Sequence, residues 1–159
     1  MRESLKARRN NMKKLFFAIA ALFIAALFAP AAQEVPFASR PPKMSPGQKI
    51  DWDFTKMNFN MASGLVFDMM VDPQKYNNKT AKIKGQFASD VHQGKRVFAV
   101  FVWDATGCCP TGLNVLPLAN KKYPADFPAD GSLVTITGVL EMANLFGQED
   151  LCLVAERWE

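Results

Sequence analysis

Histidine is nearly missing from this chain, whose 159 residues contain a single one, His92. Catalysis by a Cys-His pair or a Ser-His-Asp triad could therefore be built only around His92. The sequence places His92 in a polar turn between two expected strands, where a lone histidine is usually solvated. We expect a solvated side chain and keep His92 as a weak candidate metal ligand.

Several enzyme signatures are missing as well. The sequence contains neither a glycine-rich phosphate-binding loop nor a metalloprotease helix motif, and its cysteines do not form a Cys-x-x-Cys pair. A non-enzymatic function is therefore the favoured interpretation.

An excess of positive charge occurs only near the N-terminus. Residues 1–31 hold six of the 19 Lys and Arg residues and one of the 15 Asp and Glu residues, which leaves 13 basic and 14 acidic side chains elsewhere. The rest of the chain therefore has a net charge of about −1 and lacks the excess of basic residues that is typical of a nucleic-acid-binding domain. We expect no nucleic-acid partner.

The N-terminal region predicts a signal peptide over residues 1–31. Lys13 and Lys14 precede an apolar run from Leu15 to Ala29, and small residues follow that run. A basic start and an apolar core of about 15 residues are typical of a secretory signal, whereas a membrane span needs roughly 20 apolar residues. We expect export to the periplasm or the extracellular space, with an uncleaved signal anchor as the alternative. No cysteine stands directly after the apolar run, so we expect no lipid attachment at a new N-terminal cysteine.

The remainder divides into a tether and one domain. Residues 32–47 are rich in proline, which predicts a semi-rigid tether. Residues 48–159 are long enough for one compact domain with a single core.

A short helix is expected at the start of this domain. Ser63 is a suitable N-terminal cap, and Asp72-Pro73 ends the pattern. The predicted buried face is formed by Leu65, Val66, Met69 and Met70. Residues 57–61 are either extended or an earlier start of the same helix. Because methionines at helical spacing usually fill a core, we expect core packing rather than copper ligation from Met57, Met61, Met69 and Met70.

Five strands are expected after residue 80. Alternating apolar residues predict strands near residues 80–87 and 133–140, and the apolar run 96–103 predicts a strand covered on both faces. Residues 112–118 and 151–156 are the other two expected strands. Gly85 and Gly138 lie inside two of these strands, where a closed sheet must bend sharply. The pattern predicts a mainly β protein, a small five-stranded OB-type barrel preceded by a short helix.

Four short motifs carry a resemblance to known proteins. The sequence is similar to an uncharacterised family of small exported bacterial proteins and, more distantly, resembles the OB-like C-terminal domain of a two-component permease family. The resemblance covers residues 61–156 and implies an extracytoplasmic OB-like domain that works with a metal or a permease. The motifs are Pro73-x-x-Tyr76-x-x-Lys79-Thr80-x-x-x-x-Gly85, Asp104-Ala-Thr-Gly-Cys108-Cys109-Pro-Thr-Gly112-Leu113, Tyr123-Pro124-x-Asp126-x-Pro128 and Cys152-x-Leu-Val.

The three cysteines, Cys108, Cys109 and Cys152, are the strongest chemical feature. A bond between adjacent cysteines is strained, because Cα atoms about 3.8 Å apart are closer than disulfide geometry favours. In an OB-type barrel the third and fifth strands are parallel neighbours, so we expect Cys152 near the pair. Three alternatives stay open: a disulfide from Cys152 to Cys108 or Cys109, with Cys109–Cys152 the candidate, a site in which all three sulfurs hold zinc or copper(I), and free thiols.

Two functions are compatible with these features. The favoured one is an exported binding or accessory module for a metal or a partner protein, such as a membrane transporter or another envelope protein. The alternative is a thiol–disulfide redox protein or sensor that uses Cys108 and Cys109 with Cys152 as the resolving thiol. Asp104, beside the pair, is expected to cap the turn or to orient a thiol or metal ligand.

Overall fold

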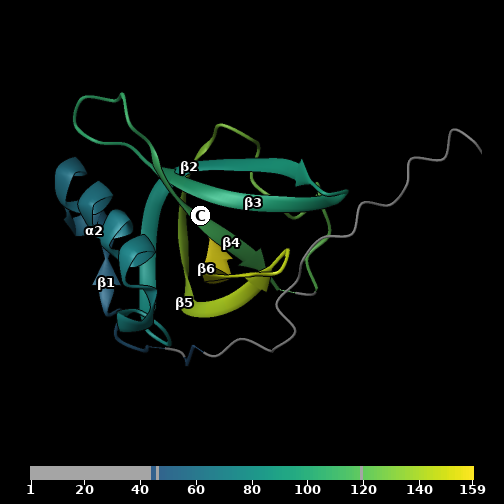
Figure 1. The fold of residues 1–159 in the computed structure, drawn as a ribbon, viewed down its shortest axis with the longest axis horizontal. Coiled ribbons are helices and arrows are strands. Elements are labelled where there is room, and N and C mark those ends of the chain that lie inside the picture. Colours follow the sequence, from purple (N-terminus) through teal and green to yellow (C-terminus); the bar gives the residue numbers. More distant parts are fainter. Residues whose placement is uncertain (1–43, 46, 119) are drawn as a thin grey trace, which may run out of the picture. The chain divides into compact units, whose positions relative to one another are not determined.

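The computed structural model describes residues 44–45, 47–118 and 120–159, so the predicted signal peptide and most of the tether lie outside the described residues. The described part is mainly β, with a six-stranded sheet and the helix α2 packed beside it (Figure 1). No helix within these residues is long and apolar enough to cross a membrane. The elements are β1 (Trp52–Asp53), η1 (Phe54–Lys56), α2 (Phe59–Val71), η2 (Pro73–Lys75), β2 (Thr80–His92), β3 (Lys95–Val102), β4 (Thr111–Pro117), β5 (Leu133–Leu145) and β6 (Gln148–Trp158).

The five predicted strands are all present, and their pairings form a closed circuit. The order is β1-β2-β3-β4-β6-β5, and β2 also pairs with β5. The β4–β6 pair is parallel, which confirms the predicted relation between the third and fifth strands. The short β1 also runs parallel to β2, while the other pairs are antiparallel.

Both hairpins are longer than the sequence pattern predicts. β2 continues to His92, which pairs with Lys95, so the turn consists of Gln93 and Gly94 instead of residues 89–95. Both turn residues have positive φ, as a two-residue hairpin turn requires. β5 likewise continues to Leu145 and β6 begins at Gln148. The extensions mix polar and apolar residues, none of which is fully buried, and their backbone pairing is independent of hydropathy.

The prediction that residues 96–103 are covered on both faces is wrong. Phe98, Val100 and Val102 are buried, whereas the residues between them are half-buried. Gly138 lies at a register shift between β5 and β6, and a Cβ atom there would collide with the carbonyl oxygen of Val154 on β6. A larger residue would therefore push the two strands apart.

Helix α2 starts earlier than Ser63, the predicted cap. Asn58 is the actual cap, and its Oδ1 accepts a hydrogen bond from the backbone N–H of Met61 at 2.9 Å. Ser63 lies within the helix, where its hydroxyl donates to the carbonyl oxygen of Asn60 at 3.3 Å. The helix ends before Asp72-Pro73, as predicted. An asparagine three residues before an apolar stretch is an equally good cap, so the earlier start was available in the sequence.

The methionines divide between core and surface. Met69 is fully buried and Met57 packs against the core, in agreement with the predicted role. Met61 and Met70 are each 59 % exposed, so the core prediction is wrong for these two. The helix buries a narrower face than predicted, and Ala62 takes a place in it.

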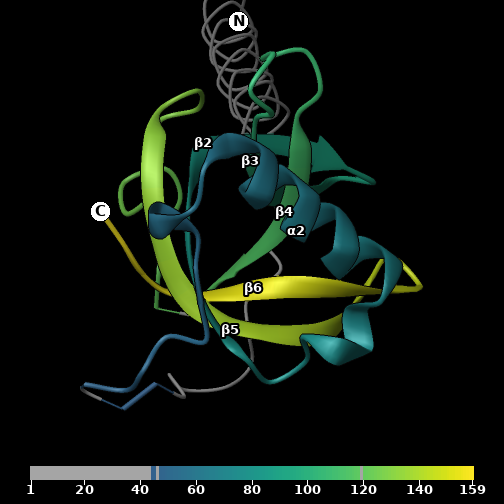
Figure 2. The same ribbon diagram turned by 90° about the vertical axis from the view of Figure 1, so that its left-hand side faces the viewer.

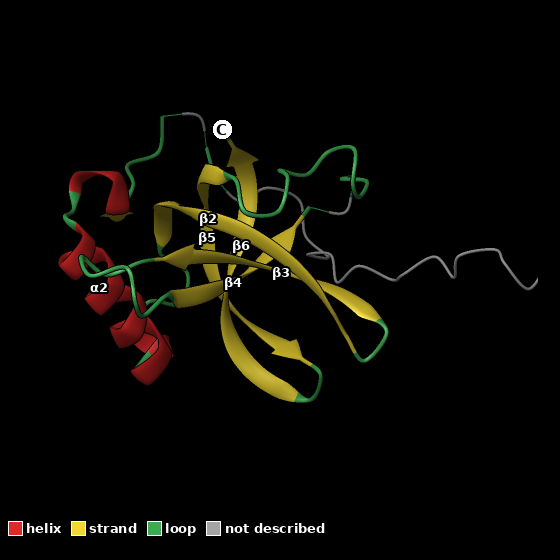
Figure 3. Cartoon of the chain, turned by 90° about the horizontal axis from the view of Figure 1, so that it is seen from above, coloured by secondary structure: helices red, strands yellow, loops and turns green. Residues whose placement is uncertain are grey.

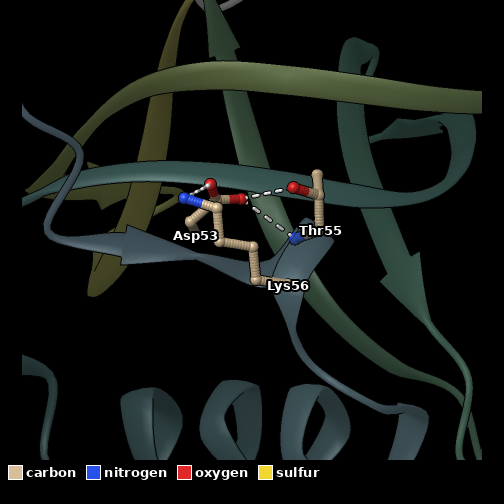
Figure 4. A network of polar contacts seen from close by, with 3 residues as sticks. All are labelled: Asp53, Thr55 and Lys56. Carbon is tan, nitrogen blue, oxygen red and sulfur yellow. Dashed lines mark hydrogen bonds and ion pairs between the residues drawn. The ribbon is translucent and has the colours of Figure 1, made fainter.

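The core lies between α2 and the strands, and Figure 2 shows α2 crossing in front of them. At the entry to the helix, Asp53 organises η1: its carboxylate accepts hydrogen bonds from the Thr55 N–H, at 3.1 Å, and hydroxyl (Figure 4). Lys56 Nζ also pairs with Asp53 Oδ2 at 3.1 Å. The core residues include Val66, Tyr76, Ile83, Phe87, Val100, Val115, Ile136, Leu140 and Leu153.

Candidate metal centre

The Cys-Cys turn connects β3 to β4 and is organised by one aspartate. Asp104 Oδ1 accepts hydrogen bonds from the Thr106 N–H at 3.1 Å, the Thr106 hydroxyl at 2.8 Å and the Cys108 N–H at 3.3 Å. Its backbone carbonyl also accepts from Gly107 N–H at 3.1 Å. The predicted turn-capping role of Asp104 is therefore confirmed. Thr106 was missed in the sequence, although Asp-x-Thr is a common pattern for such turns.

Two contacts fix the loop to the rest of the domain. The Ala105 N–H donates to Asn60 Oδ1 on α2 at 3.2 Å, and Trp103 Nε1 donates to Gln86 Oε1 on β2 at 3.2 Å. Figure 1 shows the loop extending from the sheet beside α2. No local sequence pattern predicts that Asn60 contacts the loop, because the two bonded residues are 45 positions apart in the sequence.

Three potential metal ligands converge at the end of this loop. Cys108 Sγ lies 3.4 Å from Cys109 Sγ and 3.8 Å from Asp104 Oδ2. One ligand atom from each of these residues lies within 4.8 Å of the others. Both cysteine side chains are exposed and both are free thiols. Among the described residues, this is the group of three His, Cys, Asp or Glu side chains whose spacing suits a metal ion.

Hydrogen bonds control the protonation of the site. The Thr106 hydroxyl, followed by backbone N–H groups, lowers the pKa of Asp104, so the carboxyl is ionised near neutral pH. The hydrogen bond and charge of Cys108, followed by burial and the charge of Asp104, raise the pKa of Cys109. These neighbours thus disfavour the thiolate of Cys109. A cation reverses this preference, because it stabilises thiolates and displaces their protons.

Cys152 lies apart from this pair. It is fully buried on β6 and is paired in parallel register with Asn114 on β4. Thr111, where β4 begins, is already about 10 Å from Asn114 at the usual strand rise, and Cys109 precedes Thr111. The structure therefore does not bring Cys152 to the pair, and the predicted Cys109–Cys152 disulfide is not formed in it.

The surroundings of Cys152 are apolar. Burial, followed by the nearby charge of Asp150, raises the pKa of the Cys152 thiol to about 12. The residues that pack with it are Leu116, Ala143, Leu145 and Val154.

His92 lies at the other end of β3 from the cysteine loop. It is exposed at the end of β2, and its ring meets that of Phe146 edge-on with centroids 4.7 Å apart. The two rings border a cleft of about 460 Å³ between the ends of the β2–β3 and β5–β6 hairpins, which lie side by side in Figure 3. Asp90 and Asp150 also line this cleft. The structure thus does not bring His92 to the cysteine loop.

Comparison with protein families finds no family that matches the chain, and comparison with curated proteins finds no relative. The functional argument therefore depends on the geometry of the site.

Proposed function

We propose that this chain is an exported, non-enzymatic binding module whose cysteine loop holds a thiophilic metal ion. The observation that carries the proposal is the convergence of Asp104, Cys108 and Cys109, whose ligand atoms lie within 4.8 Å of one another. Two thiolates with a carboxylate suit zinc, and a thiolate pair also suits copper(I). The loop is organised by Asp104 before any metal arrives, which reduces the ordering cost of binding.

The proposed scaffold for this site is a five-stranded OB-type barrel. The closed circuit of β2, β3, β4, β6 and β5 supports this assignment, as does the parallel β4–β6 pair. Domains of this type often bind nucleic acid or oligosaccharides. The charge of about −1 outside residues 1–31 argues against nucleic acid here, because phosphate binding needs a basic surface.

Export and an envelope partner are part of the same proposal. The basic start and the apolar run of residues 15–29 support export, and the resemblance of the Cys-Cys motif supports a partner such as a membrane transporter. A metal-binding module outside the cytoplasm would present its ion from an exposed loop, as the exposure of Cys108 and Cys109 permits.

The redox alternative has less support. A nucleophilic thiol needs a lowered pKa, but the pKa of Cys109 is raised, and residues 103–120 contain no Lys, Arg or His that could lower it. The resolving thiol expected for the cycle, Cys152, is buried and lies apart from the pair.

Metal analysis on reduced protein tests the proposal. We expect zinc or copper(I) to bind the parent protein, and Cys108→Ser and Cys109→Ser to abolish tight binding. Cys152→Ala and His92→Ala are the matched controls and should bind as the parent does. Cadmium titration gives an independent readout, since thiolate ligation produces a charge-transfer absorption. Parent protein that binds none of these metals would refute the proposal, as would binding that depends on Cys152 and not on Cys108.

A further inference from the structure

The proposed metal site is incomplete within one chain. A structural zinc ion takes four thiolate or imidazole ligands, whereas the loop offers two thiolates and a carboxylate. The remaining cysteine and the single histidine are Cys152 and His92, and both lie elsewhere in the fold. Neither of them can complete the site, so a four-thiolate zinc site at this loop needs sulfurs from a second chain.

The spacing of the two sulfurs fits one edge of a zinc tetrahedron. With Zn–S bonds of about 2.3 Å, the sulfurs of a four-thiolate site are about 3.8 Å apart. Cys108 Sγ and Cys109 Sγ are 3.4 Å apart, so a small rotation of the exposed side chains brings them to this spacing. Two such pairs facing each other supply the opposite edges of one tetrahedron.

Three exposed apolar side chains lie on elements that are linked to the cysteine loop. We call Phe59, Trp103 and Leu133 the apolar rim; they are 66 %, 38 % and 67 % exposed. Phe59 is next to Asn60, whose side chain accepts a hydrogen bond from the loop. Trp103 and Leu133 share a neighbour in Gln86, which accepts a hydrogen bond from Trp103 and is paired with Leu133 across β2 and β5. Asp104 is the one charged residue of the segment 103–112, and its Oδ1 is occupied by donors of its own turn. In a two-fold dimer bridged at the cysteine loop, we expect the apolar rim to lie at the contact between the copies.

We infer that zinc joins two copies of this chain through four sulfurs, Cys108 and Cys109 from each copy. The inference rests on the proposed metal site and deepens it by naming the partner. Four Zn–S bonds form, four thiol protons pass to solvent and no electron is transferred. Asp104 is not a ligand in this four-sulfur site and acts as a positioning residue, because its Oδ1 accepts hydrogen bonds from the Thr106 and Cys108 N–H groups that shape the turn.

The test measures molar mass by light scattering and zinc content in the same fractions, on reduced protein titrated with zinc. We expect a zinc-free monomer, a dimer with one zinc per two chains, and a return to monomer after chelation. The double variant Cys108→Ser/Cys109→Ser should stay monomeric, while Cys152→Ala should dimerise as the parent does. Trp103→Ala should weaken the zinc-loaded dimer roughly tenfold, as expected for an aromatic residue at an interface.

The possible failures are distinguishable. A monomer that binds one zinc per chain through Cys108 and Cys109 would overturn the dimer and leave the proposed metal-binding function intact. Absence of zinc binding would overturn both. A dimer that persists after chelation, or that forms in the double serine variant, would also overturn the zinc-bridged arrangement.

Discussion

Cys152 on β6 is paired with Asn114 on β4, and this register keeps the third cysteine away from Cys108 and Cys109. The parallel pairing itself follows the sequence-based expectation. The register differs from that expectation, because Cys152 is paired with Asn114, three residues after the start of β4, and not with the first residue of the strand.

The first prediction concerns thiol reactivity. In the folded, metal-free protein, two thiols should react with a small alkylating reagent and the third should react only after unfolding. The reason is that Cys108 and Cys109 are exposed, while burial raises the pKa of Cys152 to about 12. Mass spectrometry of peptides counts and locates the labels. Protein prepared without reductant that shows one thiol after unfolding, located at Cys108 or Cys109 by the same peptide analysis, would instead support a disulfide to Cys152.

The second prediction concerns Gly138. Replacement by alanine should lower the free energy of unfolding by about 2 kcal/mol or more, because the new Cβ collides with a backbone carbonyl of β6 that cannot move alone. Denaturant unfolding measures the change. Gly64→Ala in α2 is the matched control, since its Cβ meets nothing within 4 Å, and it should stabilise the helix by about 0.5–1 kcal/mol. Equal effects at both positions would contradict the tight β5–β6 contact.

The third prediction concerns pH. Asp51 Oδ2 accepts hydrogen bonds from the Thr80 N–H at 2.9 Å and hydroxyl at 2.8 Å, and these bonds, the backbone one first, lower the pKa of Asp51. The folded pKa lies below the unfolded value of about 3.9, so this contribution to stability is present above pH 4 and is lost as pH falls through the folded value.

Asp51→Asn should therefore destabilise the protein at neutral pH, with a difference from the parent that shrinks on acidification. Thr80→Val serves as the partner variant and should reduce the effect of Asp51→Asn in a double-mutant cycle. Denaturant unfolding from pH 7 to about 2.5 follows the change. A difference that stays constant over this range would show that ionised Asp51 does not stabilise the fold.

The fourth prediction concerns export. Protein recovered from the exported fraction should begin near Ala32 or Gln33, because small residues follow the apolar run that ends at Ala29. N-terminal sequencing provides the measurement. A chain that still begins at Met1 or Met12 would favour the signal-anchor alternative.

Several elements could be located from local sequence patterns alone. β2 and β5 carry apolar residues at every second position in their central parts, and Asp72-Pro73 ends α2 through steric restriction of the residue before proline. These signals are local, so no tertiary information was needed to find them. The capping role of Asp104 belongs here too, because its partners Thr106 and Cys108 are within four residues.

Which chemical groups share a site depends on tertiary packing. Asn60 reaches the cysteine loop across 45 positions, and the strand register sets Cys152 beside Asn114 and away from the pair. The ends of the two hairpins could not be predicted from the hydropathy pattern either. Exposed residues there, such as His92 and Asn144, belong to strands because their backbones pair with the neighbouring strand. Hydropathy reports which side of a strand is buried, whereas register and long-range contacts depend on how the whole chain packs.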